Sequence, residues 1–206
     1  MQPQAVVFDI GNVLIEWQPE RFFDKAIGED RRRALFAAVE LDEMNEQVDL
    51  GAHFTNTVYA KADDHPEWRD EIRLWHDSWI EMASPAIPHS IRLLRALRGK
   101  GTPVFSLSNF GIQSFDIAAA HYPCLTEFDR QYISGHMQVI KPDPQIYHML
   151  ETDSGIAPDA LLFTDDRADN IDMAHSRGWQ THLFEGPQGW ADRLVAAGLL
   201  SAHDAA

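Results

Sequence analysis

Side chains that handle phosphate or a metal ion occur in four short segments that lie far apart in the sequence. These side chains are Asp9, the neighbouring Ser108 and Asn109, Lys141, and the pair Asp165 and Asp166. Carboxylate oxygens are the ligands that hard divalent cations prefer, and hydroxyl, amide and ammonium groups bind phosphate oxygens. The combination predicts chemistry on a phosphate group with the help of a divalent cation.

Three of the four segments end a run of mostly apolar residues that suits a buried strand. The runs cover residues 5–8, 103–107 and 160–164, and they lead to Asp9, Ser108 and Asp165. In an open parallel sheet, ligands bind at the carboxyl ends of the strands. Lys141 lies instead in a loop, where Pro142 restricts the backbone around it. We therefore expect three strand ends and one loop to converge on one site.

The hydrophobic pattern predicts the elements that must position these groups. The later part of the chain alternates between helical and strand patterns, as in βαβ units. Between residues 17 and 83 the pattern is helical, with a helix over 30–41 and the next one after Gly51. We predict an α/β fold with a doubly wound, Rossmann-like parallel sheet. Its core domain would be residues 1–16 and 84–206, with a helical cap domain of residues 17–83 inserted after the first strand.

The cap and one later segment give more specific expectations. An apolar stripe at helical spacing predicts a single amphipathic helix that contains Trp68, Ile72, Trp75, Trp79 and Met82. We interpret the tryptophans of this stripe as cap core rather than as a ligand platform. Trp17, Glu43 and Asn45 are candidates for contacts with the substrate from the cap side. Residues 131–140 are expected to form a small hairpin that turns at Gly135.

At the expected sheet edge, Asp9 would lie near Asp165 and Asp166. Three carboxylates within a few ångströms of one another disfavour full ionisation, and a divalent cation relieves their repulsion. Hard oxygen ligands favour Mg²⁺ over zinc or copper, so we expect Mg²⁺ as the cofactor. Asp9 could then attack phosphorus as a carboxylate nucleophile and form an aspartyl-phosphate, which water hydrolyses.

The other two segments would hold the transferring phosphoryl group. Ser108 and Asn109 offer a hydroxyl, an amide and backbone N–H donors, and Lys141 offers a fixed positive charge. Such clamping is the main source of catalysis in phosphoryl transfer. Ser108 and Asn109 would also suit the cap of a following helix, because a helix N-terminus that binds phosphate can serve both purposes.

In their order and spacing, the four segments resemble the motifs of the haloacid dehalogenase (HAD) superfamily. The matching stretches are Phe8-Asp9-Ile10-Gly11-Asn12-Val13, Leu107-Ser108-Asn109, Lys141-Pro142 and Thr164-Asp165-Asp166. The resemblance extends over nearly all of residues 5 to 185. That superfamily also inserts a cap after the first strand, as expected for this chain. The resemblance implies an HAD-type core in which Asp9 is the catalytic nucleophile.

The resemblance also implies roles for the other residues. Asp9, the backbone carbonyl of Gly11 and Asp166 would hold the metal, with Asp165 as a further ligand or as a partner of one. Phosphate would be bound by Ser108, Asn109, Lys141 and Gly11. Lys141 would act in catalysis together with Asp9, and Asn170 would orient the acidic pair.

Gly11 departs from the pattern of that superfamily's phosphatases. They usually carry a second aspartate two residues after the nucleophile, which protonates the leaving group and activates water. A glycine can offer its carbonyl to a metal but cannot move a proton. The Asp-x-Gly-Asn stretch nevertheless resembles a branch of sugar-phosphate phosphatases within the superfamily, so the glycine does not by itself exclude activity.

These observations lead us to expect a Mg²⁺-dependent phosphomonoester hydrolase that acts on a small phosphorylated metabolite, with a sugar phosphate as one candidate. One alternative is a 2-haloacid dehalogenase, in which Asp9 would attack carbon without a metal. Another is a catalytically weak module that binds a phosphorylated ligand. A receiver domain of a signalling pathway fits less well, because its acidic pair follows the first strand and the cap would have no explanation.

Composition narrows the classes of partner. The chain has 206 residues, a net charge of −15 and a pI near 4.9, so it would repel nucleic acid and anionic membranes. Cys124 is the single cysteine, which fits a reducing compartment. The first residues lack the basic and apolar regions of a signal peptide. We expect a cytoplasmic protein, as a monomer or a homodimer, with no membrane segment.

Overall fold

A five-stranded parallel sheet lies at the centre of the protein, whose computed structural model describes residues 2–206. The strand order is β3-β2-β1-β4-β5, so β1 is central and the chain fills its two sides in turn. The strands are β1 (Ala5–Phe8), β2 (Val104–Ser108), β3 (Arg130–Ile133), β4 (Leu161–Asp165) and β5 (Gln180–Leu183). This arrangement confirms the predicted α/β fold with a doubly wound parallel sheet.

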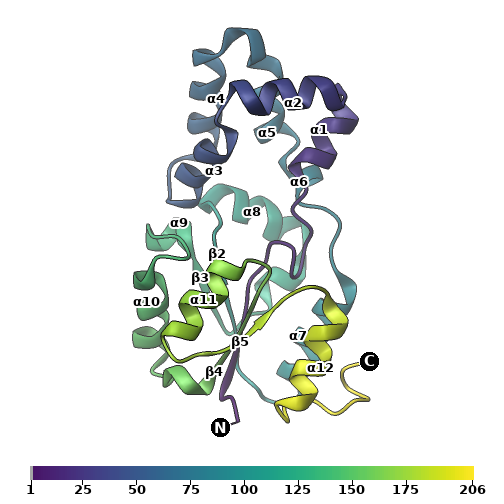
Figure 1. The fold of residues 1–206 in the computed structure, drawn as a ribbon, viewed down its shortest axis with the longest axis vertical. Helices are drawn as coiled ribbons and strands as arrows, with labels where there is room; N and C mark the ends of the chain where they lie inside the picture. Colours follow the sequence, from purple (N-terminus) through teal and green to yellow (C-terminus); the bar gives the residue numbers. More distant parts are fainter. Residues whose placement is uncertain (1) are drawn as a thin grey trace.

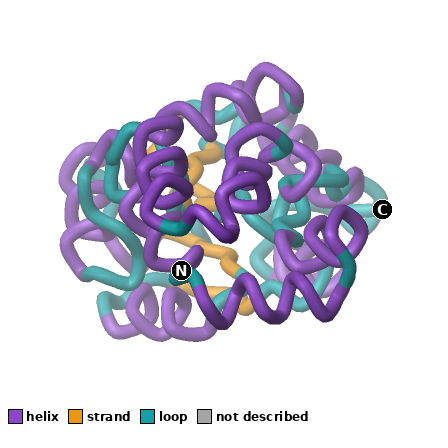
Figure 2. Tube along the Cα trace, turned by 90° about the horizontal axis from the view of Figure 1, so that it is seen from above, coloured by secondary structure: helices purple, strands orange, loops and turns teal. Residues whose placement is uncertain are grey.

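Helices cover both faces of the sheet because the central strands are apolar on both sides. Val6 and Phe8 of β1 join a hydrophobic cluster with one set of helices, whereas Ala5 and Val7 join a second cluster with the other set. The first set is α7 (Pro88–Gly99), α8 (Ile112–His121) and α12 (Pro187–Ala196); the second is α10 (Pro144–Ser154) and α11 (Ala168–Ser176). Seen from above, helices lie on either side of the strands (Figure 2).

The segment between β1 and α7 is helical, and its helices gather at one end of the molecule beyond the sheet (Figure 1). They are α1 (Pro19–Ile27), α2 (Glu29–Ala38), α3 (Leu41–Asp49), α4 (Phe54–Asp64), α5 (Arg69–Asp77) and α6 (Trp79–Met82), with a 3₁₀ turn at Pro66–Trp68. We refer to these helices as the cap helices. The domain boundaries given above for residues 17 and 83 remain a prediction.

Two predictions about the cap helices are wrong. The expected single helix from Trp68 to Met82 is broken at Ser78, where the backbone leaves helical geometry (φ −118°, ψ 23°) between α5 and α6. The expected helix over 30–41 ends at Ala38, and a separate helix, α3, follows it. α2 ends because Val39 adopts an extended backbone (φ −128°, ψ 127°), and the helical spacing of Leu41, Met44 and Val48 belongs to α3.

The predicted hairpin over residues 131–140 is also wrong. β3 pairs in parallel with β2, and the chain then enters the short helix α9 (Ser134–Met137). The reason is a polar connection to the loop after β2: Ser134 Oγ accepts a hydrogen bond from the Phe110 N–H at 2.9 Å, and the Gly135 N–H donates to the Phe110 carbonyl at 3.0 Å. These bonds hold the chain at Gly135 against the loop after β2.

Candidate functional site

The structure brings together the side chains that the sequence places at strand ends. β1 lies between β2 and β4, so Asp9 after β1 lies beside Ser108, which ends β2, and Asp165, which ends β4. Asp9, Asp165 and Asp166 each offer a carboxylate oxygen, and these oxygens all lie within 4.8 Å of one another. Lys141 reaches the same place from the loop after α9. We call these side chains the carboxylate–lysine cluster.

Lys141 is at the centre of this cluster and is almost completely buried, with 3% of its surface exposed. Its Nζ donates to Asp9 Oδ1 at 2.9 Å and to Asp165 Oδ2 at 2.6 Å. Burial acts to lower the pKa of Lys141, but the negative charges of Asp165 and Asp9 outweigh it and raise the pKa above its ordinary value. The ammonium group is therefore a permanent positive charge next to Asp9.

The two carboxylate oxygens of Asp9 have different surroundings. Oδ1 accepts hydrogen bonds from Ser108 Oγ at 2.7 Å and from Lys141 Nζ, whereas no described residue donates to Oδ2. Burial raises the pKa of Asp9 to about 6; Lys141 opposes this shift, and Asp165 and Asp166 add to it. One oxygen is held in place, and the other is available to a ligand.

Asp165 and Asp166 also differ from each other. Asp165 is fully buried, and its oxygens accept from Lys141, from Asn170 Nδ2 at 3.0 Å and from the Arg167 N–H at 2.8 Å. Asp166 lines a cavity, and one of its oxygens accepts from the side chain of Asn12. Asp165 is thus saturated with protein donors, whereas Asp166 is open to a ligand.

Asn12 is a site residue whose role the sequence reasoning missed. Its Nδ2 donates to Asp166 Oδ2 at 2.9 Å, and its Oδ1 accepts from the Trp17 N–H at 2.9 Å. Its backbone has a positive φ of 55°, a conformation that asparagine adopts more readily than most residues. The asparagine after Gly11 is therefore the signal that could have indicated a left-handed turn with a side chain directed at the acidic pair.

Asn109 and Asn170 both hold other residues of the cluster in place. Asn109 Oδ1 accepts from the Lys141 N–H at 2.7 Å, and Asn109 Nδ2 donates to the Lys141 carbonyl at 2.9 Å. The Asn109 side chain thus binds the Lys141 backbone, so its predicted contact with phosphate would have to come from its backbone. Asn170 contacts Asp165 as expected from the resemblance.

A cavity of about 570 Å³ lies between the carboxyl edge of the sheet and the cap helices. Asp9, Ser108, Lys141 and Asp166 line it, as does Gly11, whose position leaves room for a side chain because a Cβ there would meet only Trp17 Cβ, at 4.0 Å. Space therefore does not explain why Gly11 replaces a second aspartate.

The cap side of the cavity tests the three substrate-contact candidates. Trp17 and Asn45 line the cavity, whereas Glu43 is exposed on α3 and does not. Other lining residues were not expected from the sequence: Asp42, Glu46 and Asp49 of α3, together with Trp75 and Trp79. Trp75 and Trp79 are buried in the hydrophobic core as predicted, and they also form part of the cavity wall.

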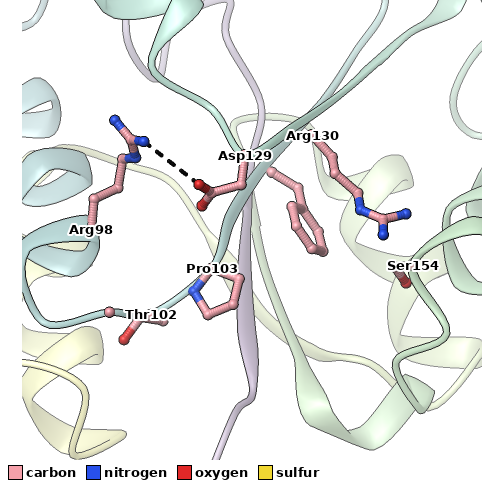
Figure 3. A pocket seen from close by; sticks show the side chains of 8 residues that line it. Arg98, Thr102, Pro103, Asp129, Arg130 and Ser154 are labelled. Atoms are coloured by element: carbon pink, nitrogen blue, oxygen red, sulfur yellow. Dashed lines mark ion pairs between the residues drawn. The ribbon is translucent and has the colours of Figure 1, made fainter.

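A second cavity, of about 600 Å³, opens at the amino ends of the strands, on the side of the sheet away from the cap helices (Figure 3). The two arginines of this cavity already have acidic partners. Arg98 Nη2 lies 3.6 Å from Asp129 Oδ1, and Arg130 Nη1 lies 2.6 Å from Asp153 Oδ2. It begins where β2 and β3 begin, and it shares no residue with the carboxylate–lysine cluster. The site for chemistry is therefore the cavity under the cap helices.

The cluster fits a hard divalent cation. Three carboxylates face one ammonium group, which leaves an excess of negative charge in a buried place. None of residues 2–206 donates a hydrogen bond to Oδ2 of Asp9, and Asp166 faces the cavity next to it. Carboxylate oxygens with space for water are the environment that Mg²⁺ prefers.

Among the described residues, no helix has the length and apolar character needed to cross a membrane.

Comparison with known proteins agrees with this geometry. Residues 3–178 match the family model of haloacid dehalogenase-like hydrolases. The chain is 22% identical to D-ribitol-5-phosphate phosphatase from Bacteroides thetaiotaomicron, over 92% of this chain and 96% of that protein. It is 30% identical to (S)-2-haloacid dehalogenase from Pseudomonas sp., over 51% of this chain and 44% of the relative.

A solved structure shares the fold. It is an HAD family enzyme from Bacteroides thetaiotaomicron in complex with magnesium and inorganic phosphate. The TM-score is 0.66 at 25% identity, with 87% of this chain and 93% of that chain covered.

Proposed function

Because the chain belongs to the haloacid dehalogenase-like hydrolases, we propose that it is a Mg²⁺-dependent phosphomonoester hydrolase that acts on a small phosphorylated metabolite. One observation carries this proposal. Asp9 has one oxygen held by Ser108 and Lys141 and the other free, directly beside Asp166, which is open to the same cavity. This is the arrangement needed for a carboxylate nucleophile that works next to a cation.

Asp9, Asp166 and the carbonyl of Gly11 would hold the Mg²⁺ ion. Asp165 has its oxygens occupied by protein donors, so we assign it the positioning of Lys141 rather than direct contact with the metal. When bound, Mg²⁺ neutralises charge on the phosphoryl oxygens. The related enzyme solved with magnesium and inorganic phosphate supports this choice of metal.

The reaction would proceed in two steps on Asp9. Its carboxylate attacks phosphorus while Lys141 donates its third N–H to the transferring group and the hydroxyl of Ser108 turns from Asp9 to the same group, and the bond to the leaving oxygen breaks. Water then hydrolyses the aspartyl-phosphate and restores the carboxylate. Asn109 and Asp165 keep Lys141 in position through contacts to its backbone and its ammonium group, respectively.

The cap side of the cavity favours a polyhydroxylated group beyond the phosphate. Trp17, Trp75 and Trp79 offer flat apolar surfaces, and Asp42 and Glu46 offer acceptors for hydroxyl groups. The same carboxylates repel a second anion, so a monophosphate is expected. Similarity to a D-ribitol-5-phosphate phosphatase supports sugar or polyol phosphates as the first compounds to test. Cytoplasmic location and a monomeric or homodimeric state remain predictions.

A phosphatase screen with and without Mg²⁺ tests the proposal. We expect phosphate release from sugar and polyol monophosphates only when Mg²⁺ is present. Asp9→Asn keeps the size of the side chain but removes the nucleophile, so turnover should fall by at least about 10³-fold. Its thermal unfolding should stay close to that of the wild type, which serves as the control for folding. Full activity of Asp9→Asn would rule out the covalent mechanism.

The two alternatives have distinct outcomes in the same assays. Halide release from a 2-haloacid in the presence of EDTA would replace the phosphatase proposal with a dehalogenase. Thermal stabilisation by a phosphorylated compound without turnover would indicate the binding module. The acidic pair favours the phosphatase over the dehalogenase. Attack on carbon needs no metal, so a dehalogenase would have no use for Asp166 as a metal ligand.

A further inference from the structure

The proposed reaction lacks a proton donor in the place where related phosphatases carry one. The leaving oxygen of an alkyl phosphate must gain a proton, and Gly11 cannot supply it. Several carboxylates of the cavity wall are poor donors: Glu16 is bound to Arg21 at 2.6 Å, and Asp42 and Glu46 are exposed to solvent. The remaining carboxylate on the cap side is Asp49, at the end of α3.

We propose that Asp49 protonates the leaving-group oxygen and afterwards accepts a proton from the attacking water. It lines the same cavity as Asp9, and its Oδ2 accepts a hydrogen bond from Asn45 Nδ2 at 3.0 Å. The inference rests on the proposed phosphatase function and assigns to a cap helix the task that Gly11 cannot perform.

Contacts with the core hold Asp49 in a fixed position. The Asp49 carbonyl accepts a hydrogen bond from Ser134 Oγ at 2.6 Å. A Cβ on Gly51, just after α3, would come within 2.6 Å of the Gly135 carbonyl oxygen, and a Cβ on Gly111 would overlap Val48. The backbones of α3 and of the loops after β2 and β3 are therefore in close contact, which fixes Asp49 relative to the sheet edge.

The electrostatic surroundings of Asp49 suit an acid and base near neutral pH. Burial raises its pKa to about 7, and the N–H of Gly111 opposes that shift. The charges of Glu46 and Asp9 raise it further, and Lys141 lowers it. Both the protonated and the ionised form are therefore accessible at neutral pH, as a group that gives and takes one proton per cycle requires.

The proton balance closes over the two steps. In the first, the Asp9 carboxylate forms a bond to phosphorus and the P–O bond to the leaving group breaks. The leaving oxygen takes the proton of the Asp49 carboxyl and departs as a neutral alcohol. In the second, water forms a bond to phosphorus and gives one proton to the Asp49 carboxylate, and the Asp9–phosphorus bond breaks. Inorganic phosphate leaves, and both aspartates regain their starting states.

Two substrates with different leaving groups test this assignment with Asp49→Asn. An alkyl monophosphate needs a protonated leaving group, so its kcat should fall by about 10²- to 10⁴-fold. p-Nitrophenyl phosphate releases a stable anion, so its first turnover should stay close to the wild-type rate. The second step still lacks its base, so we expect a burst of one nitrophenolate per enzyme followed by slow turnover.

The controls separate this role from a structural one. Glu43→Gln removes the same charge from the exposed face of α3 and should leave both substrates unaffected. Asp49→Glu should restore part of the alkyl phosphate activity. If Asp49→Asn is unfolded in a thermal melt, Asp49→Ser, which also has no carboxyl group, replaces it in the same assays.

Equal losses on the two substrates in the first turnover, or a change in KM alone, would overturn the assignment, as would wild-type kcat with the alkyl phosphate. These outcomes differ from failure of the proposed function. In that case the wild-type enzyme itself would release no phosphate in the presence of Mg²⁺.

Discussion

At the scale of single residues, the charge of Lys141 depends on its two carboxylate partners. A buried lysine without partners tends to lose its proton, because burial disfavours the charged form. Here Asp9 and Asp165 accept from its ammonium group, and the Asn109 side chain binds both its backbone N–H and its carbonyl. The same contacts leave Asp9 and Asp165 dependent on Lys141, because their negative charges are buried too.

Replacement of this lysine should therefore affect stability as well as activity. We expect Lys141→Met to abolish turnover and to lower the free energy of unfolding by about 3–5 kcal/mol, because it leaves buried carboxylates unpaired. Urea unfolding in EDTA measures this. Lys100→Met is the matched control: its partner Asp204 is at the surface, and the expected loss is at most about 1 kcal/mol. Equal losses in the two variants would contradict the central role of Lys141.

At the scale of elements, α3 is the cap helix that places carboxylates in the wall of the cavity above the carboxylate–lysine cluster. Its apolar side is narrow, but its C-terminal end lies against the core: a side chain on Gly111 would overlap Val48, and one on Gly51 would overlap the Gly135 carbonyl. Glycine is required at Gly111 for space rather than for backbone conformation, because its φ of −69° suits any residue. The close approach brings Asp42, Asn45, Glu46 and Asp49 to the cavity.

A methyl group at this contact should disturb both packing and catalysis. Gly111→Ala places a Cβ against Val48, so we expect a loss of about 1–3 kcal/mol in the free energy of unfolding. Activity should fall as well, since the end of α3 must move away from the sheet edge. Gly99→Ala is the control: a Cβ there meets nothing within 4 Å, and stability should stay the same or rise slightly. Wild-type stability and activity of Gly111→Ala would show that the contact is unimportant.

At the scale of the whole molecule, negative charge gathers where the cation would bind. The net charge is −15, and the cavity contains a buried and a half-buried carboxylate whose pKa is raised, to about 6 for Asp9 and about 7 for Asp49, respectively. A carboxyl group with a raised pKa binds its proton more tightly in the folded than in the unfolded state. The metal-free protein should therefore gain stability as the pH falls through these values.

The direction of this pH dependence leads to a test with Mg²⁺. In EDTA, the melting temperature should rise as the pH is lowered from about 8 to about 5.5, since Asp9 and Asp49 become protonated in that window. Mg²⁺ should stabilise the protein more at the higher pH, because protons compete with the metal for Asp9 at the lower one. Differential scanning calorimetry at several pH values measures both effects. A melting temperature that falls steadily over this range in EDTA would contradict the raised pKa values.

Asp204, a half-buried carboxylate far from the cavity, has the opposite effect on stability. Hydrogen bonds from Ser201 and Lys100 lower the pKa of Asp204 to about 2, so its contribution to stability is lost only in stronger acid.

Asp9→Asn provides a further check on the pH dependence, because it should reduce the gain in stability at low pH. It should also weaken the stabilisation by Mg²⁺.

The sequence by itself determined the elements whose signal is local. Apolar runs followed by Asp9, Ser108 and Asp165 predict buried parallel strands with polar groups at their carboxyl ends, and the geometry of such sheets brings these ends together. Convergence of the carboxylates with Lys141 could therefore be predicted without coordinates. The same holds for the helical character of the segment after β1.

Only the tertiary structure decided the features that depend on contacts between distant segments. Residues 131–140 form a helical turn because Ser134 and Gly135 bond to Phe110, and no local pattern shows that partner. Asp165 and Asp166 are neighbours in sequence, but their different donors separate a positioning residue from a residue open to the cavity. Asp49 lines the cavity because backbone atoms at glycines come into contact, and such steric fit has no periodic signature in the sequence.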